Sequence, residues 1–225
     1  MVAIGGQPLT TVGTLTKLTM TSGSAKTTGP GITNTSASAA GSLASFHCNG
    51  VSIAEVYRGN ILGEGGFRYH AIFSFNTTVT GNRGFIGLVD VNTAPTNIDP
   101  TTSTTPGKIG LGFISPTGAI SLINNVSGTS PTTQTFGTSF RVNTTDLFEL
   151  TLQNVPYTSQ ANGIAWRIRR FTTNLVTPAF EQSGIITTNL PAATTLLHPV
   201  AWMTNNAQTT PVAFNCYSMT IEANR

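Results

Sequence analysis

The chain has 225 residues, of which only 8% are charged and 39% are hydrophobic, and its net charge at pH 7 is +3. An average soluble domain has roughly 25% charged residues, so hydroxyl and amide side chains must keep this surface hydrated. The weak, dispersed positive charge excludes the dense basic footprint of a nucleic-acid-binding protein. No apolar run is long enough to span a membrane, so we expect no membrane insertion.

Residues 1–42 are rich in Thr, Ser and Gly and show no period that would bury one face. We therefore expect a short extended N-terminal arm, followed by one domain over residues 43–225. The first residues, MVAIGGQPLT, lack the basic and apolar stretches of a signal peptide, which predicts synthesis and retention in the cytosol. In that compartment Cys48 and Cys216, which lie among strand-forming residues, are expected to be free buried thiols; a disulfide is the alternative.

From residue 43 onward, short apolar segments with a period of two recur between Gly, Pro and Asn residues. In DLFELTLQNV, Phe148, Leu150 and Leu152 would share one face. In IAWRIRRFT, the apolar residues would point inward while Arg167 and Arg169 point outward. No amphipathic helix interrupts these segments. The pattern predicts an all-β fold with less than one-tenth helix, an antiparallel two-sheet β-sandwich of the jelly-roll or concanavalin-like type.

The stretch DVNTAPTNIDPTTSTTPGK, residues 90–108, is too long and too polar for a tight turn, so we expect a surface loop shaped by its prolines. Such loops often carry recognition, which makes Asn92, Asn97 and Asp99 candidate ligand-binding residues. With Asp90 they would offer a cation hard oxygen ligands, but the spacing is not that of an EF-hand. We expect these side chains to brace the loop, with no metal and no cofactor.

The ionisable residues give little sign of catalysis. The eight acidic residues are dispersed, and Asp146 and Glu149, the only close pair, would lie on opposite faces of one strand. His47 and His70 lie in strand-like runs, His198 lies at a strand entry, and no G-x-S-x-G elbow marks a nucleophile. We therefore expect no catalytic residues and no enzymatic activity.

A basic cluster is formed by Arg167, Arg169 and Arg170. A solvated strand face is the more common explanation of such a cluster. The alternative is a site for phosphate or an acidic sugar, and on that basis Arg167 and Arg169 join the candidate ligand-binding residues.

Several long motifs occur in order along the chain: GLVDVNTAPTNIDPTT, KIGLGF, DLFELTLQNVP, LPAATTLL and AWMTNNA. Together they closely resemble a domain found at the C-terminal ends of tailed-bacteriophage structural proteins, typically tail-fibre or other virion-surface proteins. The resemblance runs from about residue 40 to residue 225. It departs from that pattern in having only a short Thr/Gly-rich lead and an unusually basic strand, IAWRIRRF, and both departures bear on how the protein would attach to a virion.

The resemblance implies a lectin-like β-sandwich that is assembled in the host cytoplasm, is located on the virion and binds host surface glycan. A capsid decoration or baseplate protein without a receptor-binding role is the alternative. The resemblance also implies contacts with other virion proteins. Trp202 would be anchored in the core, and Asn205 and Asn206 would brace the next hairpin. Phage fibres are commonly threefold and an apolar-poor arm cannot fold alone, so we expect a homotrimer.

Overall fold

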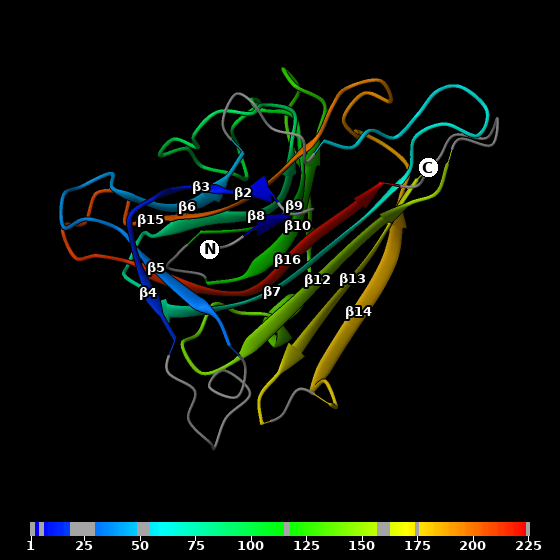
Figure 1. Ribbon diagram of the computed structural model, residues 1–225. Helices are drawn as coiled ribbons and strands as arrows, with labels where there is room; N and C mark the ends of the chain where they lie inside the picture. Colours follow the sequence, from blue (N-terminus) through cyan, green and yellow to red (C-terminus); the bar gives the residue numbers. More distant parts are fainter. Residues whose placement is uncertain are drawn as a thin grey trace.

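The computed structural model describes residues 3–4, 7–18, 30–48, 55–114, 118–156, 163–173 and 176–223. Two antiparallel sheets of seven strands each form most of this part of the chain (Figure 1). The described residues contain no α-helix, and their only helical element is a short 3₁₀ turn, η2 (Gly137–Ser139). The predicted all-β, two-sheet antiparallel sandwich is confirmed.

The first sheet, called here the β8 sheet, consists of β3 (Thr10–Val12), β6 (Leu43–His47), β8 (Arg83–Val89), β9 (Lys108–Ile114), β10 (Ile120–Asn125), β11 (Thr132–Thr135) and β15 (His198–Thr204). The second, the β7 sheet, consists of β4 (Thr14–Lys17), β5 (Ile32–Thr35), β7 (Phe67–Thr77), β12 (Leu147–Asn154), β13 (Ile164–Phe171), β14 (Phe180–Ile186) and β16 (Ala213–Ala223). A separate pair is formed by β1 (Ala3–Ile4) and β2 (Gln7–Pro8).

The strand order is β11-β10-β9-β8-β15-β6-β3 in the β8 sheet and β14-β13-β12-β7-β16-β5-β4 in the β7 sheet. Strands that are far apart in the sequence are therefore neighbours: β7 lies between β12 and β16, and β15 lies between β8 and β6. This connectivity brings side chains from distant segments onto one sheet face.

The main core lies between the sheets and is built by strict alternation. Phe148, Leu150 and Leu152 on β12 have no exposed surface and belong to the main apolar cluster, as predicted. The inward faces of the two sheets meet through aromatic rings: Phe75 of β7 and Phe113 of β9 are in edge-to-face contact, with ring centroids 4.9 Å apart. Such burial supplies most of the stability of a sandwich.

The outer side of the β8 sheet carries a second, smaller cluster beneath the 90–107 loop. Trp202 is buried there with Phe85 and Val200, and Ile98 of the loop packs against them. The prediction that Trp202 is anchored in the core is confirmed, and the core that holds it is this second cluster rather than the main one. Its neighbours Ala201 and Met203 take the inward positions on β15, so alternation turns the indole to the outer side.

Glycines let this second layer approach the sheet closely. A Cβ atom added to Gly110 on β9 would lie 2.3 Å from the carbonyl oxygen of Ile86 and 2.8 Å from Cζ of Phe85. The absence of a side chain at Gly110 thus leaves room for the neighbouring strand and for the Phe85 ring.

The 90–107 loop is held by a buried lysine. Lys108 is 2% exposed, and its Nζ donates to the carbonyl oxygens of Ser103 at 2.7 Å and Pro106 at 3.2 Å. Burial lowers the pKa of this ammonium to about 8. Asn125 also donates through Nδ2, to the carbonyl oxygen of Thr104 at 2.8 Å. The loop is therefore a fixed cover for the outer side of the β8 sheet.

The structure differs from the predicted division at residue 42. Within residues 1–42, β3 pairs with β6 in the β8 sheet, while β4 and β5 complete the edge of the β7 sheet. Gly13, with φ of +101°, allows the chain to pass from β3 to β4 and so from one sheet to the other. The fully buried Asn34 then donates to the carbonyl oxygens of Val12 and Ser45, both at 2.9 Å, which ties the two sheets together. Polar Thr-rich strands can join a sandwich because their backbone bonds and buried amides fix them without a large apolar face.

The AWMTNNA segment runs from β15 into a turn. Asn205 is fully buried and donates through Nδ2 to the carbonyl oxygens of Ala39 at 3.0 Å and Thr210 at 3.3 Å. Asn206 follows with φ of +53°, a conformation that Asn tolerates better than most residues. The prediction that an amide braces the following turn is confirmed for Asn205, whereas Asn206 contributes its backbone N–H, which donates to Thr204 Oγ1 at 3.1 Å.

Both cysteines are buried and unlinked. Cys216 lies on β16 and Cys48 follows β6, so they belong to different sheets. The prediction of two free thiols is confirmed.

Candidate functional site

The outer side of the β7 sheet presents a group of polar side chains on β7, β12, β13 and β14. The inward positions of these strands are taken by core residues such as Tyr69, Ala71, Leu150 and Ile168. Alternation therefore turns the intervening residues outward. We call this group the His70–Glu149 face; its members are His70, Glu149, Thr151, Arg167, Arg169, Glu181 and Ser183.

Strand register arranges the His70–Glu149 face in two rows. In the first row, Thr151 lies opposite both His70 and Arg167. In the second, Arg169 lies between Glu149 on β12 and Glu181 on β14. Side chains opposite each other on neighbouring strands have Cβ atoms about 5 Å apart, so the members contact one another across the strands.

Glu149 is the centre of this arrangement. Its carboxylate lies 3.5 Å from His70 Nε2, 3.5 Å from Arg167 Nη2 and 3.7 Å from Arg169 Nη1. The hydrogen bond from His70 and the charges of Arg169, His70 and Arg167 lower the pKa of Glu149, and burial opposes them. Glu149 is therefore an ionised, largely buried carboxylate held by three cationic or proton-donating groups.

Thr151 and Arg167 on the same face each have a buried polar atom without a hydrogen-bond partner within the described ranges. Thr151 is 9% exposed and its Oγ1 has none, and Nε of Arg167 has none either. Buried hydroxyl and guanidinium groups are normally satisfied, because leaving them unpaired costs about 1–3 kcal/mol each. Both atoms are buried beneath the face, whereas the Arg167 side chain as a whole is 37% exposed and presents its remaining guanidinium donors to solvent.

The formal charges of the His70–Glu149 face cancel. Arg167 and Arg169 contribute two positive charges, Glu149 and Glu181 contribute two negative charges, and Arg169 Nε lies 3.0 Å from Glu181 Oε2. With neutral His70 the sum is zero. Such a face offers both donors and acceptors, which suits neutral hydroxyl groups better than a polyanion.

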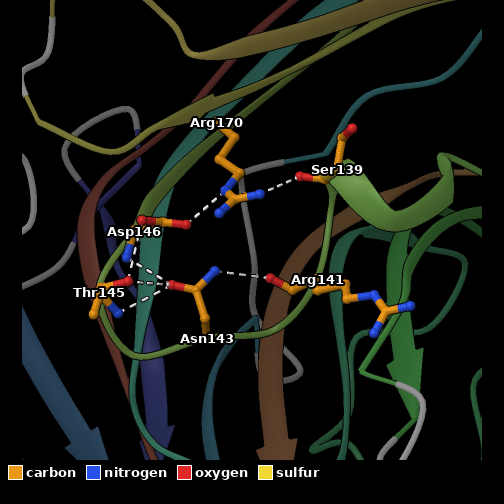
Figure 2. A network of polar contacts seen from close by, with 6 residues as sticks. All are labelled: Ser139, Arg141, Asn143, Thr145, Asp146 and Arg170. Carbon is orange, nitrogen blue, oxygen red and sulfur yellow. Dashed lines mark hydrogen bonds and ion pairs between the residues drawn. The ribbon is translucent and has the colours of Figure 1, made fainter.

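Arg170 does not belong to the basic cluster that the sequence suggested. It points to the opposite side of β13, where Nε donates to Asp146 Oδ2 at 2.5 Å and Nη1 donates to the carbonyl oxygen of Ser139 at 2.5 Å (Figure 2). In the same network Asn143 Oδ1 accepts from the backbone N–H of Thr145 at 3.0 Å and of Asp146 at 2.8 Å. Arg170 therefore braces the loop between η2 and β12, and only Arg167 and Arg169 belong to the candidate site.

The other predicted residues lie on the other sheet. Asn97 Oδ1 accepts from Thr204 Oγ1 at 3.2 Å. Asp99 Oδ1 accepts from the N–H of Thr101 at 2.8 Å and from its hydroxyl at 2.7 Å, which caps a turn. Asn92 is half-buried and also has an interaction partner. The structure does not bring these loop residues together with Arg167 and Arg169, and it gives Asn97 and Asp99 bracing roles.

The remaining histidines have local partners. His47 Nδ1 lies 3.1 Å from Ser45 Oγ, and His198 Nδ1 lies 3.9 Å from Glu55 Oε1. Burial lowers the pKa of both imidazoles. Among the residues that the structure describes, no three His, Cys, Asp or Glu side chains are grouped so that they could hold a metal ion. No helix in this part of the chain is long and apolar enough to cross a membrane.

Sequence reasoning missed His70, Glu149 and Thr151 as parts of one site. Their alternation with apolar residues in FRYHAIF and LFELTL indicated that they share outward positions. It did not indicate that β7 and β12 are adjacent, which depends on strand order.

Solved structures share this fold, although no family model and no curated protein matches the chain. Lectin II from Ulex europaeus is 14% identical with a TM-score of 0.54, covering 100% of this chain and 96% of that chain. The endo-β-1,4-glucuronan lyase of the fungus Trichoderma reesei is 9% identical with a TM-score of 0.52, covering 98% and 92%. An alginate lyase of polysaccharide lyase family 7 is 11% identical with a TM-score of 0.50, covering 87% and 80%. At such identities the likeness establishes a lectin-like, concanavalin-type β-sandwich.

These structures correct the prediction that the protein is not an enzyme. That prediction was wrong, because the same sandwich is the fold of polysaccharide lyases as well as of lectins. It relied on the lack of a short catalytic motif. A sheet face assembles its side chains from separate strands, as it does for His70 and Glu149, so a motif search in the sequence does not detect such a site.

Proposed function

We propose that the protein binds a glycan on the His70–Glu149 face and serves as a surface module of a bacteriophage virion. The observation that carries the binding proposal is a charge-balanced polar sheet face on which the side chains of Arg167, Arg169 and His70 are 37%, 25% and 23% exposed. The lectin-like fold supports it, and the resemblance to phage virion proteins supports the biological setting.

The chemistry of the face matches sugar hydroxyl groups. The guanidinium of Arg167, whose side chain is 37% exposed, can donate two hydrogen bonds to neighbouring hydroxyls. Arg169, whose side chain is 25% exposed, adds further donors, and Glu149 holds both arginine side chains in a fixed orientation. Because Glu149 and Glu181 already neutralise the arginines, the preferred ligand is an uncharged segment of the host polysaccharide rather than a polyanion.

A glycan array of host-surface polysaccharides tests this proposal, followed by calorimetric titration of the best ligand. We expect Arg167→Ala to weaken binding about tenfold, because a hydrogen bond to a charged group is worth about 1.5–3 kcal/mol. Arg169→Ala should also weaken binding, because this guanidinium is 25% exposed on the same face. Arg141→Ala, at an exposed position outside the face, is the matched control. Equal binding by all three variants would refute this location of the site.

The virion assignment needs a separate experiment. Electron microscopy of virions with the protein labelled by an antibody should show the label on tail fibres. Label on the head or baseplate would support the alternative, a structural protein without a receptor-binding role.

A second candidate function is cleavage of the bound glycan. The observation that favours it is the contact of His70 with Glu149 at 3.5 Å, with the His70 side chain 23% exposed. A carboxylate that orients an imidazole toward an open face is the arrangement of a general base. Where the bound glycan carries a single uronic acid residue among neutral sugars, such a base could remove the C–H proton next to that carboxylate. Its electron pair would form a carbon–carbon double bond and expel the glycosidic oxygen, which takes up a proton from water.

Incubation with neutral and uronic acid polysaccharides tests this candidate. Elimination produces an unsaturated sugar that absorbs in the ultraviolet, whereas hydrolysis produces reducing ends without that absorbance. Cleavage lost in His70→Ala but retained in His47→Ala would support a role for His70. Cleavage retained in His70→Ala would exclude it.

A further inference from the structure

The outer edge of the β7 sheet is an unprotected strand. Among the described residues β14 is paired on one side only, with β13, and Figure 1 shows it in gold at the margin of the molecule. Five of its seven residues are exposed and the other two are half-buried, and Ile185 is 70% exposed. An edge of this length leaves backbone donors and acceptors ready to pair with another strand.

The other three sheet edges are better protected. β3 has three residues, β4 has four and ends in the exposed Lys17, and β11 is a four-residue strand of Thr and Gln. Short strands and edge lysines are the usual means of preventing edge-to-edge association. The single charge on β14, Glu181, is already paired with Arg169 at 3.0 Å. Among these four edge strands β14 is therefore the longest, and it has the fewest features that would prevent pairing with another strand.

We propose that β14 pairs with β14 of a second copy of this chain in antiparallel orientation, giving a two-fold dimer with one continuous sheet of fourteen strands. A two-fold axis at Ser183 places Ser183 opposite its own copy and Glu181 opposite Ile185 of the second copy. The two Glu181 side chains then lie about 14 Å apart along the strands, so like charges do not meet. The residues opposite each other share a sheet face, as antiparallel pairing requires.

The dimer joins the two His70–Glu149 faces side by side. Three strand spacings separate β13 from β13 of the second copy, which places the two Arg167 positions about 14 Å apart. A polymeric glycan lying across the strands would contact both sites and gain avidity over a single repeat. This consequence rests on the proposed glycan binding, whereas the assembly itself does not. This proposed dimer is an alternative to the trimer that the sequence suggested, and the chain mass in solution distinguishes the two.

Light scattering and sedimentation of the full chain at micromolar concentration test the assembly. We expect twice the chain mass for the wild type. Ile185→Glu places a carboxylate opposite Glu181 twice in each dimer, so we expect a monomer. Ile185→Lys places an ammonium at the same position and should keep the dimer. Thr133→Glu, on the exposed β11 edge of the other sheet, is the control and should stay dimeric.

Far-UV circular dichroism shows whether each variant keeps the fold. A monomeric or trimeric wild type overturns the proposal. Equal masses for the folded Ile185→Glu and Ile185→Lys variants overturn the proposed pairing. Binding of a long glycan should weaken in Ile185→Glu, while binding of a single repeat stays constant. If neither binds, the glycan proposal fails and the mass measurements still decide the dimer.

Discussion

Replacement of Glu149 by Gln is the most informative perturbation, because one carboxylate organises the whole face. The change keeps the size of the side chain and removes its charge. The Arg167 guanidinium at 3.5 Å has a gross attraction of about 5 kcal/mol for the carboxylate at an effective dielectric constant of about 20, and Arg169 at 3.7 Å adds a similar attraction. Dehydration of a carboxylate that is only 12% exposed offsets most of this attraction, and partial exposure of the cations weakens it further. We expect Glu149→Gln to lower the free energy of unfolding by about 1–3 kcal/mol at pH 7.

The pH dependence provides a second measurement. The folded protein lowers the pKa of Glu149, so at acidic pH the unfolded state binds a proton that the folded state does not. The stabilisation by this carboxylate is present above its unfolded pKa and is lost as the pH falls through the folded pKa. Between pH 6 and pH 3 the wild type should therefore lose more stability than Glu149→Gln.

Urea unfolding followed by tryptophan fluorescence measures both effects, since Trp166 and Trp202 are each 4% exposed in the folded state. Glu181→Gln is the control. It removes a partner of Arg169 at 3.0 Å whose side chain is 43% exposed, so the expected loss is only about 0–1 kcal/mol. If both variants lose the same stability and both follow the pH profile of the wild type, Glu149 does not organise the face.

Three further outcomes follow from the fold. Gly110→Ala should lower the free energy of unfolding by about 1–3 kcal/mol in urea titrations, because its Cβ would lie 2.3 Å from the carbonyl oxygen of Ile86; an unchanged midpoint would contradict this packing. Burial lowers the pKa of Lys108 to about 8, so between pH 8 and pH 10 the unfolded state keeps a proton that the folded state has lost. The free energy of unfolding of the wild type should therefore rise over this range relative to that of Lys108→Met, and a fall would contradict the prediction. Burial raises the pKa of Cys216 to about 12, and both cysteines are buried, so alkylation of the native protein should modify neither. In denaturant without reductant, mass spectrometry should find both cysteines alkylated.

The sequence by itself determined the class of fold and the facing of individual strands. Alternation in DLFELTLQNV and IAWRIRRFT correctly assigned Phe148 and its neighbours to the core and Arg167 and Arg169 to the outside. The turn at Asn205 was expected from the resemblance, and its bond to the carbonyl oxygen of Thr210 is local, whereas its bond to Ala39 joins distant parts of the chain. These features depend on the period of two and on local backbone conformation, and a few adjacent residues determine both.

Only the tertiary structure decided which strands are neighbours, and with them the site. His70 and Glu149 meet because β7 pairs with β12. Alternation alone places Arg170 on the other side of β13 from Arg167, but only the tertiary structure shows that this side lies against the loop that contains Ser139. Trp202 lies outside the main core because the 90–107 loop supplies a second apolar layer over the β8 sheet. Pairing between distant strands is set by the summed packing of the whole sandwich, and no short stretch of sequence specifies it.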